Sequence, residues 1–239
     1  LDNIEVSVQP DKKTIAIILV DEDHLRQFRI FCEDCIIIIE QNASRDVMSI
    51  VATLNKAIES WVSLLKRGRR GLSMSTELGL VGELFVIRET LCNAFSLADC
   101  VKGWNGPKGH EQDFLLNRCL VEVKCQLASR DKIVKISSLE QLDCISGQIY
   151  LSHVGLSVAD GVVAGSFSLS QMVDDLIQQM VGDNYSIDTF LGKLELLSYV
   201  HGKTECSNNY INSFSNFYRI DDKFPRLVRG DVPPAIENT

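Results

Sequence analysis

The polar pair Asn117-Arg118 and its flanking residues constrain the fold of this chain more than any other part of the sequence. Apolar segments lie on both sides of the pair, at 114–116 and 119–121. Two apolar segments joined by two polar residues are typical of a tight β-hairpin. The spacing therefore predicts two antiparallel strands, with facing residues set by an even-length turn.

This register determines where three charged side chains lie. Asp113 would lie directly opposite Glu122, and Lys124 would share a strand face with Glu122 because side chains alternate between the two faces. Opposed carboxylates, with side-chain roots roughly 5 Å apart, repel each other unless a cation lies between them. The residues either tolerate this repulsion or bind a metal ion. A short Glu-x-Lys sequence is also compatible with an ordinary strand whose charged side chains face the solvent.

The donor atoms of this candidate site favour particular ions. Carboxylate oxygens, completed by water, suit Mg²⁺ or Mn²⁺, whereas Zn²⁺ would call for histidine or cysteine. A lysine beside the carboxylates can stabilise charge that develops on a phosphorus centre, or it can orient an attacking water. The pattern therefore indicates the chemistry of phosphodiester cleavage.

Residues 77–92 are apolar on nearly every side, which predicts a buried helix. Gly79 and Gly82, one turn apart, would let this helix approach a sheet closely. Glu83 lies among apolar residues of the helix, so its carboxylate needs a partner, which could be a metal ion or a buried arginine or lysine. The candidate N-cap residues are Ser73, Ser75 and Thr76.

The order of a helical glutamate, an aspartate and a Glu-x-Lys sequence resembles the PD-(D/E)XK nuclease superfamily. Several longer strings are similar to its DUF4420 group, and the likeness spans roughly residues 20 to 235. These strings are Gly79–Leu84, Gly103–Pro107, Asp113-Phe114, Ile136–Leu142 and Phe224–Leu227.

The resemblance implies an α/β fold with a restriction-endonuclease-like central mixed β-sheet flanked by helices. It also implies that Asp113 and Glu122 ligate Mg²⁺ or Mn²⁺, and that Glu83 is an accessory acid for a second ion or a water. Lys124 would be the catalytic lysine, and Gln126 matches a polar position of some members.

This chain departs from the family pattern at Gln112, where the family has proline before the aspartate. Proline there shapes the turn and ligates nothing, so the departure does not exclude activity.

The function implied by the resemblance is a metal-dependent endonuclease acting on DNA in a prokaryotic restriction or defence system. Its partners would be DNA and either a second copy of the chain or companion subunits. Two alternatives remain open from the sequence. One is a nuclease-fold subunit that serves as an interaction or scaffold module, and the other is a hydrolase of another phosphodiester or nucleotide.

Hydrophobic periodicity predicts a small α+β N-terminal subdomain with a connecting helix at 1–70. The resemblance implies that residues 71–239 form a nuclease-like domain with a C-terminal helical extension. The expected strands lie within 4–20 and at 132–137 and 148–156. The expected helices lie at 21–35, 47–65, 139–144, 169–181 and 186–200, and an extended tail begins at Phe224.

A formal net charge of −8 argues against a protein that binds polyanions in general, although one short part of the chain is strongly basic. Arg67, Arg69 and Arg70 form a basic loop that could hold a nucleic-acid backbone, or could be a solvated linker closing the preceding helix. Lys108 is a further candidate for substrate binding. It lies in the glycine-rich loop of Trp104, whose indole could contact substrate or pack inside the protein.

The sequence has no run of 18 or more apolar residues and no secretory signal, so we expect a soluble, cytoplasmic protein without membrane contact. The chain begins at Leu1 and not at methionine, so we expect a natural N-terminal portion to precede it.

Overall fold

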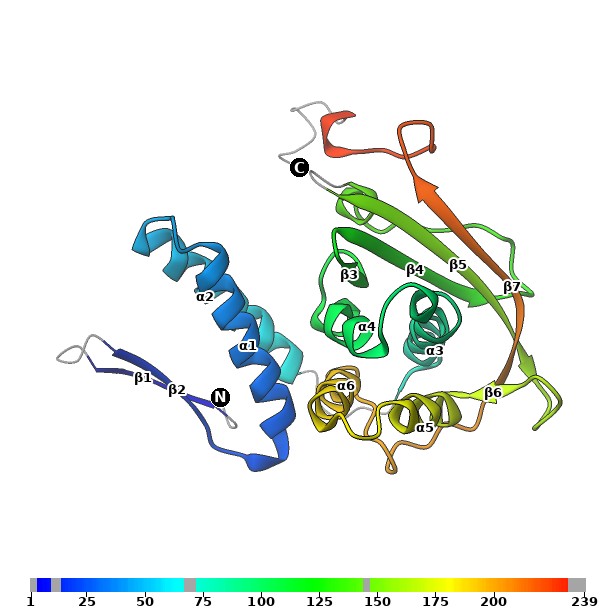
Figure 1. Cartoon of the computed structure of the whole chain (residues 1–239), viewed down its shortest axis with the longest axis horizontal. Helices are drawn as coiled ribbons and strands as arrows, with labels where there is room; N and C mark the ends of the chain where they lie inside the picture. The colour runs from blue at the N-terminus through cyan, green and yellow to red at the C-terminus, as the bar shows by residue number, and fades with distance from the viewer. Residues whose placement is uncertain (1–3, 10–13, 67–71, 144–146, 232–239) are drawn as a thin grey trace.

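The computed structural model describes residues 4–9, 14–66, 72–143 and 147–231. Among these residues, five strands form a mixed sheet (Figure 1). The strand order is β3 (Phe114–Leu116), β4 (Cys119–Leu127), β5 (Gln148–Ala159), β7 (Asn209–Ile220) and β6 (Phe167–Ser168). Strands β4 and β5 are parallel, whereas the other neighbouring strands are antiparallel. The predicted central mixed sheet is confirmed.

The hairpin of β3 and β4 has the predicted register, with Phe114 paired to Val121 and Leu116 to Cys119. Its two turn residues have positive φ angles, 46° at Asn117 and 71° at Arg118. A two-residue turn of type I′ requires this left-handed backbone at both positions, and its twist matches that of the flanking strands. The turn therefore fixes which residues of β4 lie beside the start of β3.

Helices cover one face of the sheet (Figure 1). They are α3 (Met74–Glu89), α4 (Leu97–Gly103), α5 (Leu169–Gln179) and α6 (Asn184–Leu196). Ser73 is the N-cap of α3, since its side chain accepts a hydrogen bond from Thr76 N. Apolar side chains of these helices and of β4 and β5 form the main core, with Val81, Leu84, Val154 and Trp104 fully enclosed.

The other face of the sheet carries a second, smaller core beneath a segment that we call the covering segment, residues 132–143. Leu142 of this segment packs with Ile149, Leu151 and Ile220 of the sheet, and Val134 and Ile136 lie against the same cluster. The predicted strand at 132–137 is therefore wrong, because these residues form no strand. Their apolar side chains Val134 and Ile136 pack onto the sheet, and their main chain does not pair with a neighbouring strand.

The N-terminal part combines two strands and two helices, β1 (Ile4–Gln9), β2 (Thr14–Leu19), α1 (Leu25–Gln41) and α2 (Val47–Lys66). The strands pair antiparallel, which confirms the expected α+β unit. Asp21 caps the short 3₁₀ helix Glu22–His24 that leads into α1. The boundary at 70/71 stays a prediction.

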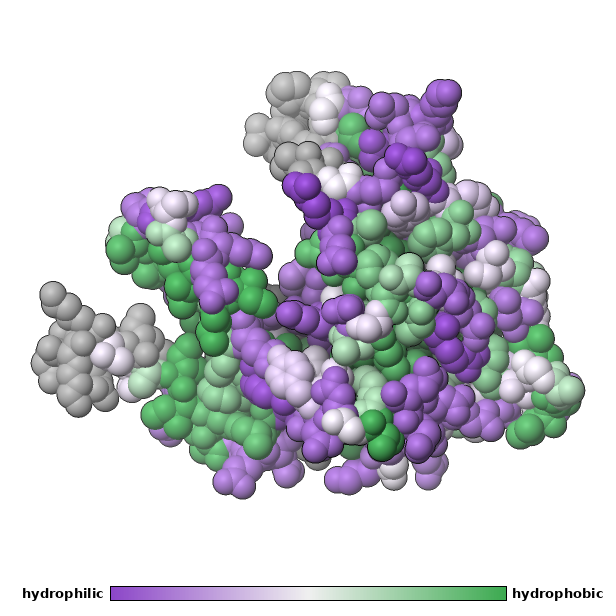
Figure 2. All heavy atoms as spheres, viewed as in Figure 1, coloured by the Kyte–Doolittle hydropathy of each residue, from purple (hydrophilic) through white to green (hydrophobic). Residues whose placement is uncertain are grey.

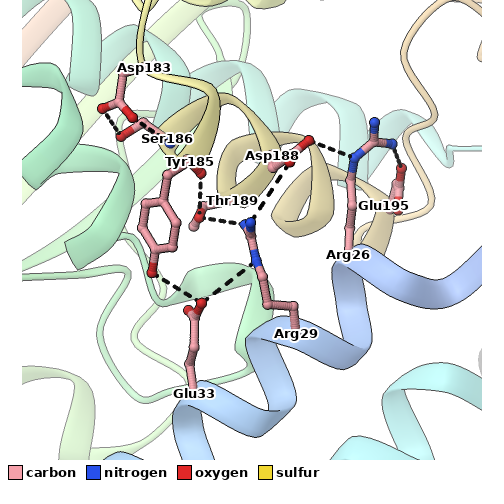
Figure 3. A network of polar contacts seen from close by, with 9 residues as sticks. All are labelled: Arg26, Arg29, Glu33, Asp183, Tyr185, Ser186, Asp188, Thr189 and Glu195. Carbon is pink, nitrogen blue, oxygen red and sulfur yellow. Dashed lines mark hydrogen bonds and ion pairs between the residues drawn. The ribbon is translucent and has the colours of Figure 1, made fainter.

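Helix α1 packs against α6 through a polar network (Figure 3). Arg26 binds Asp188 at 3.3 Å and Glu195 at 3.0 Å. Arg29 donates to the Thr189 hydroxyl at 2.8 Å, and its guanidinium lies over the ring of Tyr185. These contacts attach the N-terminal part to the body that contains the sheet.

Apolar side chains also reach the surface of the N-terminal part, where Figure 2 shows them over α1 and α2. The exposed ones include Ile36, Ile37, Ile39, Val47 and Met48. Among the described residues, no helix is long and apolar enough to cross a membrane.

Strand β7 was not predicted from the sequence. Its serine and asparagine residues resemble a loop, although Tyr210, Phe214 and Tyr218 recur with a strand-like spacing. The predicted helices at 169–181 and 186–200 exist but end earlier, at Gln179 and Leu196.

We predict that Gly82→Ala destabilises the protein, because a Cβ at this position of α3 would overlap the side chain of Cys125 on β4. Overpacking of this kind costs about 1–3 kcal/mol. Urea unfolding measures the change. Gly79→Ala on the same helix is the control, since a Cβ there would meet nothing within 4 Å. Equal stability of the two variants would contradict the close approach of α3 to the sheet.

Candidate functional site

Asp113 lies one residue before β3 and is held by the main chain on both sides. Its carbonyl oxygen accepts hydrogen bonds from Asn105 N at 2.6 Å and Gly106 N at 3.0 Å. Its carboxylate oxygen Oδ2 accepts from Val123 N at 2.7 Å. These contacts tie the aspartate to β4 beside Glu122, as the hairpin register predicts.

Glu122 is 2% exposed and lies on the face of β4 that the covering segment hides. Lys124 Nζ forms an ion pair with its Oε1 at 2.8 Å. Its other oxygen, Oε2, is buried and has no hydrogen-bond partner among the described residues. One half of this carboxylate is therefore desolvated and uncompensated, a state that costs free energy unless another group binds there.

Burial raises the pKa of both carboxyl groups. The pKa of Glu122 rises to about 7, because desolvation and the nearby Asp113 outweigh the contact with Lys124. The pKa of Asp113 rises to about 6, because desolvation outweighs the hydrogen bond from Val123 N and the charge of Lys124. A positive charge beside the two carboxylates would lower both pKa values, because it favours the ionised form.

Glu83 reaches the same place from α3. The Trp104 indole donates a hydrogen bond to its Oε2 at 2.5 Å. A Cβ added at Gly106 would lie 2.7 Å from this oxygen and 2.9 Å from Asp113 Oδ1, so both carboxylates border Gly106. Desolvation, followed by the charges of Asp113 and Glu122, raises the pKa of Glu83 well above its usual range.

Two alternatives from the sequence are resolved by these contacts. The partner of Glu83 among the described residues is the Trp104 indole and not an arginine or lysine. The Trp104 side chain is fully buried and packs near Phe190, so it does not offer its ring to a substrate.

The structure thus brings together Glu83, Asp113, Glu122 and Lys124.

The other predicted site residues have different partners or lie outside the described residues. Gln126 donates to Asp131 O at 2.8 Å and contacts His153 at 3.0 Å. Lys108 Nζ binds Asp34 of α1 at 2.8 Å. Arg67, Arg69 and Arg70 lie outside the described residues. The roles of all these residues stay predictions.

Sequence reasoning missed two contributors to the site. Gln141 Oε1 of the covering segment accepts a hydrogen bond from Lys124 Nζ at 3.1 Å. Gly106 leaves the space that Glu83 and Asp113 occupy. Both residues fall in or beside strings that carry the family resemblance, but nothing in their residue type indicated these contacts.

The residues present fit a hard divalent cation in chemistry, although no three acidic, histidine or cysteine side chains of the described residues form a ready-made metal cluster. The uncompensated oxygen of Glu122 and the raised pKa values of Asp113 and Glu122 indicate a site that lacks positive charge. Carboxylate oxygens are the ligands that Mg²⁺ and Mn²⁺ prefer.

A mixed sheet flanked by helices, with acids and a lysine at the hairpin of β3 and β4, is consistent with a nuclease-like α/β fold of the restriction-endonuclease type. The chain belongs to the DUF4420 family, whose model, described as "Putative PD-(D/E)XK family member", matches residues 1–239. No curated protein and no solved structure matches the chain.

We predict that Asp113→Asn stabilises the metal-free protein at pH 8. The pKa of Asp113 rises from its ordinary 3.8 to about 6 on folding, so the folded state binds more protons than the unfolded state in that window. Stability therefore falls as pH rises through it, and the loss persists above it. Asparagine removes the charge while its side-chain oxygen still accepts from Val123 N.

Thermal unfolding without divalent cations measures this effect. The Tm of Asp113→Asn should exceed that of the wild type by roughly 2–6 °C at pH 8. The difference should vanish at pH values below both pKa values, the ordinary 3.8 and the folded value of about 6, where the wild-type carboxyl is protonated in both states. Asp222→Asn, at an exposed position, is the control. A Tm difference that does not change with pH would contradict the burial of this charge.

Proposed function

We propose that this protein is a metal-dependent endonuclease that hydrolyses phosphodiester bonds in DNA. The observation that carries the proposal is the convergence of Glu83, Asp113 and Glu122 beside Lys124. Desolvated carboxylates in this arrangement repel each other, and the pair Asp113 and Glu122 is suited to hold a divalent cation. Membership of the DUF4420 family supports the same function.

Asp113 and Glu122 would hold Mg²⁺ or Mn²⁺, which supplies charge stabilisation for a phosphoryl centre and lowers the pKa of a water. Lys124 keeps a positive charge beside Glu122 and would orient the attacking water or bind a phosphate oxygen. Glu83, held by the Trp104 indole, would accept a hydrogen bond from a second water or assist a second ion.

The substrate and the biological setting are part of the proposal. We propose that Arg67, Arg69, Arg70 and Lys108 contribute to binding the DNA backbone, and that Gln126 assists the site from the end of β4. We place the protein in the cytoplasm of a prokaryote, in a restriction or defence system. A second copy of the chain or companion subunits would be needed to cut both strands of a duplex.

A second candidate function has one observation in its favour. The Glu122 side chain is only 3% exposed, and Lys124 neutralises one of its oxygens at 2.8 Å. A carboxylate that is covered and paired in this way suits a nuclease fold that serves as an interaction module. This candidate predicts that the protein binds no divalent cation.

We predict that the wild type binds Mg²⁺ or Mn²⁺ and that Asp113→Asn and Glu122→Gln each lose this binding. Protons compete with the cation, so the association constant should rise with pH through the window around 6 to 7 given by the two carboxyl pKa values. Isothermal titration calorimetry measures the binding, and a plasmid-cutting assay on the same samples measures activity.

The control is Glu89→Gln, which removes an exposed carboxylate from the same helix that carries Glu83. Binding and cutting that persist in the control but vanish in the site variants establish the nuclease. Binding without cutting would indicate a missing partner or another phosphodiester substrate. Absence of binding in the wild type would exclude the proposed function and favour the interaction module.

A further inference from the structure

The covering segment presents one polar side chain to Lys124. Gln141 Oε1 accepts a hydrogen bond from Lys124 Nζ at 3.1 Å and another from Ser137 N at 2.9 Å. The second contact comes from the main chain of the same segment, so the amide oxygen of Gln141 has a fixed direction. Lys124 therefore has two acceptors, Gln141 on one side and Glu122 on the other.

The covering segment is attached to the residues that flank Asp113. Gln112 Nε2 donates to Glu140 O at 2.5 Å, and Ser138 Oγ donates to Glu111 Oε2 at 3.0 Å. The polypeptide that carries Gln141 is thus aligned with the polypeptide that carries Asp113. A movement of one would move the other.

A distant part of the chain attaches the same segment from the other side. Arg226 Nη1 donates to Leu142 O at 2.6 Å, and Phe224 packs in the small core that contains Leu142. The two strings that carry the family resemblance outside the acids, Ile136–Leu142 and Phe224–Leu227, therefore contact each other at Leu142. These contacts help to fix the position of the covering segment, which carries Gln141.

The two acceptors of Lys124 differ in what a cation would do to them. A divalent ion on Glu122 would draw the carboxylate charge away from the ammonium, because both cations would bind the same carboxylate. The amide of Gln141 is neutral and is already oriented by Ser137 N, so it binds a divalent ion less well than a carboxylate does. The amide can keep its hydrogen bond to Lys124 when a divalent cation binds Glu122.

We infer that Gln141 is a positioning residue that retains the Lys124 ammonium in the site when a divalent cation occupies Glu122. The inference rests on the proposed function, since it requires that a cation binds. Without Gln141, the ammonium would lose both acceptors at once and would turn toward solvent, which already reaches 21% of the Lys124 side chain.

The test measures Lys124 directly, by acylation of its amine and mass spectrometry of the peptide, with and without Mg²⁺. Calorimetry on the same samples reports whether Mg²⁺ binds. The variants are Gln141→Ala, which removes the acceptor, and Gln141→Glu, which keeps an oxygen in the same place. Gln148→Ala is the matched control, because the side chain of Gln148, at the start of β5, bonds to Ile220 O and Arg219 of β7 and not to Lys124.

We expect Mg²⁺ to increase the acylation of Lys124 much more in Gln141→Ala than in the wild type, Gln141→Glu or Gln148→Ala. A displaced catalytic group reduces turnover steeply, so kcat for DNA cutting should fall about 10- to 100-fold in Gln141→Ala. The Mg²⁺ affinity should stay close to that of the wild type, because Gln141 does not hold the cation.

Three results would overturn the inference. If Mg²⁺ binds and changes Lys124 acylation equally in Gln141→Ala and the wild type, Gln141 does not position the lysine, while the proposed function stands. If Gln141→Ala loses Mg²⁺ affinity at unchanged kcat, Gln141 serves the cation and not the lysine. If the wild type binds no Mg²⁺, the proposed function fails and the inference fails with it.

Discussion

The crowding of carboxylates beside the Lys124 ammonium is the interaction on which the rest of the structure depends. Glu83, Asp113 and Glu122 come from different elements. The charge of Asp113 raises the pKa values of Glu83 and Glu122, and the charge of Glu122 raises the pKa of Glu83. A protein keeps such a group together only if its surroundings prevent the carboxylates from moving apart. The hairpin, the close approach of α3 and the covering segment provide that restraint.

The loop between α4 and β3 shows how far the restraint extends. Trp104 of this loop binds Glu83, and Lys193 of α6 donates to the carbonyl oxygens of Val101, Lys102 and Trp104 at 2.7, 3.0 and 2.5 Å. Lys193 is 2% exposed, and its burial lowers its pKa well below the ordinary value. Asp34 of α1 binds Lys108 in the middle of the same loop. The N-terminal part and α6 therefore act on the site through the loop that orients Glu83.

The sequence was sufficient where local geometry decides the outcome. A two-residue turn sets the hairpin register, so the position of Asp113 close to Glu122, and of Lys124 beside Glu122, followed from spacing. The sequence was insufficient where tertiary contacts determine the local structure. Residues 132–137 have the alternation of a strand but pack on the face of a sheet, and β7 has the composition of a loop but pairs with β5. Gln141 could not be recognised, because its contact with Lys124 depends on where the covering segment lies.

The covering segment also bears on how Lys124 would stay beside Glu122 if a cation binds this carboxylate. Lys124 neutralises one oxygen of Glu122, while the other is buried and unpaired, so the charge of the group is only partly balanced. An entering cation would complete this balance but would compete with Lys124 for the same carboxylate. A lysine with no second acceptor would be expelled at the moment when its charge is needed. The neutral amide of Gln141, fixed by Ser137 N, resolves this conflict because it binds the ammonium without adding a charge that would bind the metal more tightly.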